Sequence, residues 1–136
     1  MSINRRNIQP EALHQRRVDN RVLYSHVVKV EPRELIFVSG QLSRDKEGRI
    51  VGAGDMRAQL RQTLENVKVA LEAAGASLSD LVRTNTYVTD IDEYFKHTDV
   101  RMEYYNHAMP TSTTVEVRRL AQLELMVEID AIAAVG

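Results

Sequence analysis

Alternating apolar and polar positions predict most of the β-strands in this chain. The clearest case is Val82–Thr89, where β-branched residues alternate with Arg83, Asn85 and Tyr87. Such alternation is typical of a strand, because successive side chains point to opposite faces. Short apolar or β-branched runs predict further strands at Ile3–Ile8, Tyr24–Val30, Leu35–Ser39, Thr113–Arg118 and Leu123–Ala133. Residues 9–21 are polar and contain Pro10, so we expect a loop there.

A helical period predicts two helices. The first begins at Asp55 and stops before Gly75, and its apolar stripe has spacings of four and three: Met56, Leu60, Leu64, Val67 and Leu71. The second is predicted from Asp92 to His107, and its stripe is Ile91, Phe95, Met102 and Tyr105, with the polar Thr98 and Arg101 beside it. Between them, Ser77–Asp80 has the pattern of a short capping box.

The two predicted helices can cover only one face of a sheet built from these strands. Two strands are nevertheless apolar on both of their faces, namely Leu35–Ser39 and the last strand. A sheet with one wet face should alternate apolar with polar residues instead. The second apolar face therefore predicts contact with another subunit, because no helix remains to cover it.

The composition indicates one soluble domain spanning residues 1–136. Of the 136 residues, 43% are hydrophobic and 27% are charged, with a formal net charge of −1. This balance gives no positive field for nucleic acid or a membrane surface. Polar residues follow the basic start MSINRR, which predicts no secretion signal and a cytoplasmic location. The chain has no cysteine, and its four histidines lack metal-ligand spacing, so we expect no metal site.

Five segments resemble the reactive intermediate deaminase family (Rid, also called YjgF) over residues 22–134. They are Tyr24-Ser25-His26, Phe37–Gln41, Gln59–Asn66, Leu71–Val82 and Val127–Ala133. The order and spacing of these segments, more than any single one, carry the resemblance. It implies a chorismate-mutase-like α+β fold, with a mixed or antiparallel sheet and two helices on one face. It also implies a homotrimer whose sheets form a central barrel, with small-molecule clefts between subunits. It further implies hydrolysis of enamine and imine acids without metal or cofactor.

One departure from the family pattern affects the expected activity. The deaminases of the family carry an arginine that pairs with the substrate carboxylate, and Ser112 stands at its position. A hydroxyl cannot replace a bidentate ion pair, so we expect weak turnover of small imino acids. Arg101 is a candidate substitute cation, or else a solvated or interface salt-bridge residue. Thr114 and Thr98 stand where many members have cysteine and some have asparagine, respectively.

The resemblance also implies the remaining site residues. Glu128, on the last strand, corresponds to the family's glutamate near the end of that strand, which helps to activate water, and the alternative is a structural acid between subunits. Tyr24 is expected to line the cleft or pack at a subunit boundary, while Ser39 and Gly40 allow close backbone approach of a ligand. We expect deamination of an imine or enamine, or else a non-catalytic, ligand-binding or regulatory role. RNA cleavage does not fit the charge balance.

Overall fold

The computed structural model describes residues 3–136, so Met1 and Ser2 of the basic N-terminal stretch lie outside the described part. A four-stranded sheet has the order β5 (Glu34–Leu42), β8 (Val127–Val135), β6 (Leu81–Val88) and β7 (Thr111–Glu116). Its first three strands pair antiparallel, and β6 pairs parallel with β7. Two small antiparallel pairs precede it in the chain, β1 (Asn4–Ile8) with β4 (Val27–Glu31) and β2 (Arg17–Val18) with β3 (Arg21–Val22).

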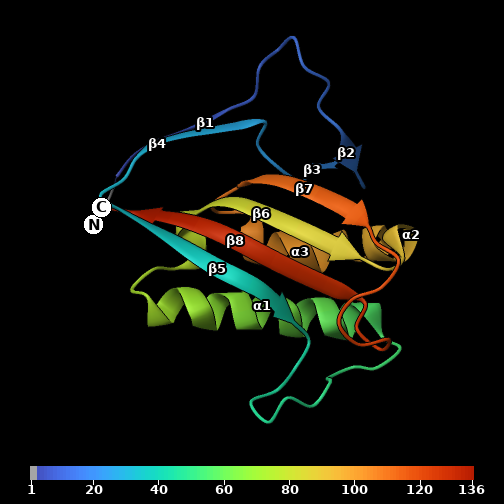
Figure 1. Ribbon diagram of the computed structural model, residues 1–136. Helices are drawn as coiled ribbons and strands as arrows, with labels where there is room; N and C mark the ends of the chain where they lie inside the picture. Colours follow the sequence, from blue (N-terminus) through green and yellow to red (C-terminus); the bar gives the residue numbers. More distant parts are fainter. Residues whose placement is uncertain (1–2) are drawn as a thin grey trace.

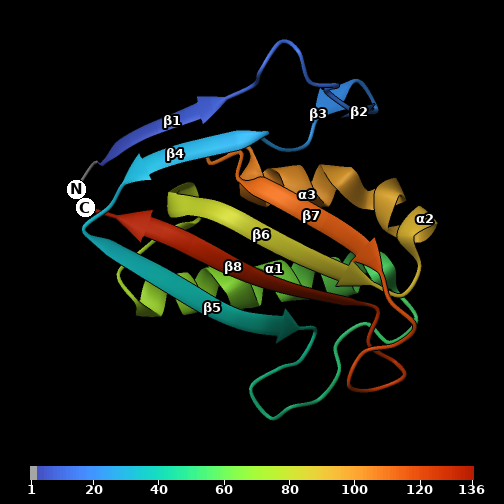
Figure 2. The same cartoon turned by 45° about the horizontal axis from the view of Figure 1, so that its top comes forward.

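The helices lie together on one face of the four-stranded sheet (Figure 1). The long helix α1 (Met56–Ala73) packs on β5 and β8. The short helices α2 (Ile91–Tyr94) and α3 (Thr98–Tyr105) lie on the same face, below β6 and β7 in the view of Figure 1. Figure 2 shows this face behind the sheet, while the described residues leave the front face open. The predicted α+β class, with a mixed sheet and helices on one face, is therefore confirmed.

The core lies between the sheet and the helices. The stripe of α1 is buried against the alternate residues of β8 that point to the same side, Val127, Ile129, Ala131 and Ala133. On the open face, by contrast, Leu35 and Phe37 of β5 are 53% and 67% exposed. The sheet thus has one covered face and one open face that is partly apolar, as the sequence pattern predicts. No helix among residues 3–136 has the length and apolar character needed to cross a membrane.

The last strand begins later than its apolar sequence predicts. Leu125 is fully buried but lies in a loop, and β8 starts only at Val127. The buried side chain of Gln59 explains this, because it donates to Glu124 O (2.8 Å) and accepts from Met126 N (2.8 Å). These bonds satisfy backbone groups that a strand would otherwise pair.

Other predicted boundaries are wrong as well; the strand predicted from Tyr24, for example, begins only at Val27. Strand β5 does not end at Gly40 but continues to Leu42 through a β-bulge, because the register against β8 shifts between Val38 and Gln41. Strand β7 begins and ends two residues early, since its partner β6 ends at Val88. The predicted second helix is interrupted by a 3₁₀ turn at Phe95–His97.

Candidate functional site

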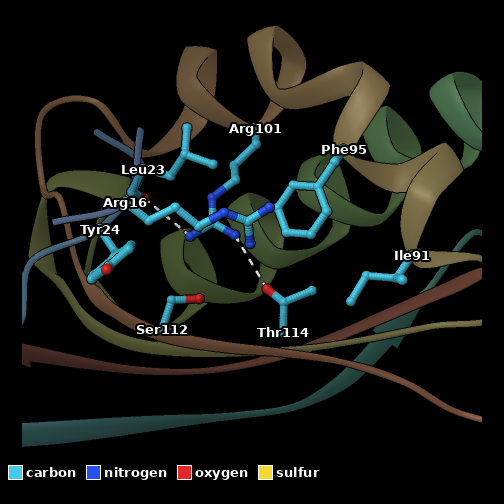
Figure 3. Close-up of a pocket in the computed structure, with 8 residues that line it drawn as sticks. All are labelled: Arg16, Leu23, Tyr24, Ile91, Phe95, Arg101, Ser112 and Thr114. Carbon is cyan, nitrogen blue, oxygen red and sulfur yellow. Dashed lines mark hydrogen bonds between the residues drawn. The ribbon is translucent and has the colours of Figure 1, made fainter. Parts of the chain in front are cut away.

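A cavity of about 160 Å³ opens between α2, α3 and the edge strand β7 (Figure 3). Four of the residues that sequence analysis singles out line it: Tyr24, Arg101, Ser112 and Thr114. Four further residues complete the lining: Arg16, Leu23, Ile91 and Phe95. Two of the eight lining residues are arginines, and none is acidic. This charge balance favours an anionic ligand.

Arg101 is the buried cation of this cavity. Its side chain leaves α3 and is only 3% exposed. The guanidinium donates to Tyr94 Oη (2.9 Å), to Leu23 O (3.0 Å) and, at 3.5 Å, to Thr114 Oγ1. Its Nε is buried without an acceptor, and no carboxylate among residues 3–136 pairs with it. Because arginine is almost never fully buried unless paired, an unpaired buried guanidinium beside a cavity points to an anion from outside the chain.

Two tyrosines share the surroundings of Arg101. The guanidinium lies over the Tyr105 ring, with Cζ 5.2 Å from the ring centroid. Burial raises the pKa of Tyr105, so that its phenol stays neutral. Burial also opposes the charge on Arg101, but the neighbouring Tyr94 and Tyr105 oxygens favour it, and the pKa of Arg101 lies above its ordinary value. The cavity therefore holds a permanent positive charge whose neighbours do not neutralise it.

Ser112 and Thr114 belong to the helix-covered face of the sheet. They pair in register with Thr84 and Thr86 of β6, both fully buried against the helices. Thr84 Oγ1 lies 3.2 Å from Ser112 Oγ and can donate to it. The alternation of β7 therefore directs both hydroxyls toward Arg101, on the cavity side.

A strained turn holds the start of β7 in place. Met109 has φ +44°, the left-handed region that costs a non-glycine residue energy, and it precedes Pro110. Asn7 Nδ2 donates to Met109 O (3.0 Å), to Ala108 O (2.8 Å) and to Ser25 Oγ (2.9 Å). Ser25 in turn donates from its backbone N to Pro110 O. These bonds tie Tyr24, which precedes Ser25, to the strand that carries Ser112.

Arg16 enters the cavity from the loop before β2. Its guanidinium lies over the Phe95 ring, 4.4 Å from the centroid, and the side chain is exposed. Within residues 3–136 this guanidinium makes no hydrogen bond or ion pair. Figure 3 shows it beside Arg101 in the same space.

Glu128 lies on the opposite, open face of the sheet. It pairs in register with Tyr87, whereas its neighbours Val127 and Ile129 are buried under the helices. Its carboxyl group lies against the backbone of Gly40, where a Cβ would overlap Glu128 Oε2. Gly40 and Ser39 form the bulge of β5, so the bulge and the missing side chain together make room for this carboxylate.

The open face holds a second carboxylate near Glu128. Asp130 accepts from Asn85 Nδ2 (2.8 Å) and from Tyr87 Oη (3.1 Å). The bond to Asp130 raises the pKa of Tyr87, which keeps that phenol protonated. Asp130 is thus engaged in hydrogen bonds, while no side chain within residues 3–136 donates a hydrogen bond to Glu128.

The predicted site residues therefore fall into two groups on opposite faces of one sheet. Tyr24, Arg101, Ser112 and Thr114 form the cavity group, while Ser39, Gly40 and Glu128 form the open-face group. Thr98 belongs to neither group, because its side chain is buried in α3 with an unpartnered hydroxyl. No group of His, Cys, Asp and Glu side chains in residues 3–136 is arranged to hold a metal ion.

Comparisons with known proteins agree with this fold. The family model described as Endoribonuclease L-PSP matches residues 14–135. The solved structure of a Rid family protein from Yersinia pestis superposes with a TM-score of 0.84 and 30% identity, over 97% of this chain and 99% of that one. The chain belongs to the Rid/YjgF family.

Other Rid relatives cover most of the chain as well. A RutC family protein from Pyrococcus abyssi is 38% identical over 110 residues, which are 81% of this chain and 84% of that protein. The 2-iminobutanoate/2-iminopropanoate deaminase of Salmonella typhimurium is 35% identical over 111 residues, which are 79% of this chain and 85% of that protein. The chain shares its family and fold with these relatives, whereas the name deaminase belongs to the Salmonella typhimurium protein.

Proposed function

We propose that this Rid protein forms a homotrimer that binds a small carboxylate-bearing metabolite between subunits and hydrolyses its imine or enamine form. The observation that carries the proposal is Arg101, a buried guanidinium that lines a cavity and has no acidic partner within residues 3–136. Sequence analysis leaves open whether Arg101 replaces the missing arginine at Ser112. Its burial beside Thr114 Oγ1 favours replacement over a solvated or interface salt bridge.

The two groups of site residues support an inter-subunit cleft. Within one chain the sheet separates Glu128 from Arg101, so a single chain cannot bring them to one ligand. In a trimer that buries the open face, the open-face group of one subunit meets the cavity group of the next. The exposed Leu35 and Phe37 support such an assembly, because exposed apolar patches mark contacts.

The reaction follows from the roles of these residues. Arg101 holds the carboxylate, with Ser112, Thr114 and Tyr24 around the polar end of the substrate. An enamine first tautomerises to the imine. The Glu128 carboxylate then takes a proton from water as the water oxygen bonds to the carbon of the protonated imine, which gives a neutral carbinolamine. Glu128 returns this proton to the amine nitrogen and takes up the hydroxyl proton as the C–N bond breaks, so that ammonia leaves and a 2-keto acid remains.

The test removes the guanidinium of Arg101 from α3 and then supplies a new one from β7, at position 112. We expect Arg101→Met to lower the rate of ammonia release from 2-iminopropionate, formed in situ by an amino-acid oxidase, roughly a hundredfold, since losing one partner of a desolvated charge pair costs about 2–5 kcal/mol. Adding Ser112→Arg to this variant should restore part of the rate. Arg57→Met, on the outer surface of α1, is the control. Near wild-type activity in a folded Arg101→Met protein would overturn the proposal.

A non-catalytic ligand-binding role is the second candidate. It is favoured by the exchange of arginine for Ser112, which removes the family's carboxylate partner from β7. Saturable binding of pyruvate that depends on Arg101, without any imine hydrolysis, would support this second role. RNA cleavage is not proposed, because the net charge is −1 and an RNA site needs a basic surface.

A further inference from the structure

The cavity contains one more cation than a simple imino acid requires. Arg16 and Arg101 both line a space of about 160 Å³, and no acidic residue lines it with them. Among the residues of one chain that line the cavity, nothing pairs with the second guanidinium when the ligand is a monocarboxylate. A ligand with two acidic groups neutralises both.

Both guanidiniums lie near an aromatic ring. The Cζ of Arg16 is 4.4 Å from the centroid of the Phe95 ring, and that of Arg101 is 5.2 Å from the centroid of the Tyr105 ring. The Nη atoms of Arg101 donate to Tyr94, Leu23 and Thr114, so Arg101 has fewer N–H groups left for a ligand than Arg16 has. Arg16 donates to no group within residues 3–136, so all of its donors remain available.

Arg101 lies deeper in the cavity than Arg16 does. Arg101 is fixed by bonds to Tyr94 and Leu23 and lies next to Thr114. Arg16 is exposed and comes from a loop. The apolar part of the lining is formed by Leu23, Ile91 and Phe95. Such a cavity fits a carboxylate at its inner end, a short carbon chain along the apolar walls and a second acidic group at Arg16.

We propose that the ligand of this cavity is a short-chain dicarboxylate, and that Arg16 is the residue that selects its second carboxylate. The inference rests on the proposed function, and it names the substrate class as the imine of an acidic amino acid. The small volume and the single exposed guanidinium favour a planar carboxylate over a phosphate at the second position.

Calorimetry with glutarate and pentanoate tests the selection directly, because the two differ only in the second carboxylate. We expect glutarate to bind roughly tenfold more tightly, which corresponds to about 1.4 kcal/mol. Arg16→Gln should remove this difference by weakening glutarate binding far more than pentanoate binding. Arg17→Gln removes a neighbouring exposed charge outside the cavity and should retain the preference for glutarate.

Equal affinities of the wild type for the two ligands, or an equal loss for both ligands in Arg16→Gln, would overturn the inference. Tighter binding of 4-phosphonobutyrate than of glutarate would overturn the choice of carboxylate.

Turnover separates this inference from the proposed reaction. Ammonia release from 2-iminoglutarate and from 2-iminopropionate is measured with the same variants. A protein that prefers glutarate through Arg16 but hydrolyses neither imine would support the ligand class and contradict the reaction. A protein that hydrolyses both imines equally, with and without Arg16, would support the reaction and contradict the ligand class.

Discussion

Gly40 determines where the Glu128 carboxylate lies. The carboxyl group occupies the volume that any larger residue would fill with its Cβ, and the β-bulge brings the backbone of Gly40 toward it. This contact does not require a left-handed backbone at Gly40, in contrast to the glycines of the turns. Glycine is therefore needed here for close approach of a side chain from the neighbouring strand.

We expect Gly40→Ala to lower imine hydrolysis as strongly as Glu128→Gln does, because the new methyl group displaces the carboxylate. Thermal unfolding should change little, since the side chain at position 40 points to the open face. The control is the double variant with Glu128→Ala, in which Gly40→Ala should have no additional effect. An additional loss in that background would mean that Gly40 acts on the substrate by another route.

The sequence identifies half of the eight cavity residues and misses Arg16. Ser112 and Thr114 follow from strand alternation and the family pattern, and Arg101 stands out as a charge beside an apolar stripe. Arg16 lies in a polar loop, where neither a hydrophobic periodicity nor a motif predicts that its side chain reaches the cavity. Its contact with Phe95 is a tertiary contact between segments nearly eighty residues apart, and no local signal encodes it.

At the scale of elements, buried polar side chains set boundaries that hydrophobic patterning misses. The run from Leu123 has the apolar character of a strand, yet Gln59 of α1 takes the backbone bonds of Glu124 and Met126. The small hairpin β2–β3 was predicted as part of a loop. Its turn residues Asp19 and Asn20 have φ values of +50° and +61°, and such asparagine-containing two-residue turns are a recognisable hairpin signal.

We expect Gln59→Leu to destabilise the protein by about 2 kcal/mol, because it leaves the buried backbone groups of Glu124 and Met126 without partners. The change should appear as a lower midpoint of thermal unfolding, measured by circular dichroism. Gln62→Leu, one turn away on the same helix, serves as the matched control, since within residues 3–136 the side chain of Gln62 bonds only to Asn66. Equal midpoints for the two variants would contradict this account of the β8 boundary.

At the scale of the whole molecule, the open face of the sheet exposes large apolar side chains. Leu35 and Phe37 are exposed there beside the hydrogen-bonded Asp130 network. A face of this kind is apolar enough to associate and polar enough to fix the orientation of its partners. This surface supports the proposed trimer, whose sheets enclose a common interior.

Light scattering of the wild-type protein should give three times the mass of one chain. Phe37→Asp should shift the protein to monomers, because it places a charge in the proposed interface without touching the core. Leu123→Asp is the control, since Leu123 is 74% exposed but lies in the loop before β8. A stable wild-type monomer, or a Phe37→Asp protein that remains trimeric, would contradict the assembly.

The separation of Arg101 and Glu128 by one sheet has a genetic consequence. In the proposed ring, each reaction centre takes one half from each of two chains. Two alleles, one damaged at Arg101 and the other at Glu128, are each inactive when expressed alone. Expressed together, they form mixed rings in which some boundaries join the intact half of one product to the intact half of the other. Lesions in different halves therefore complement each other within a single gene, whereas two lesions in the same half do not.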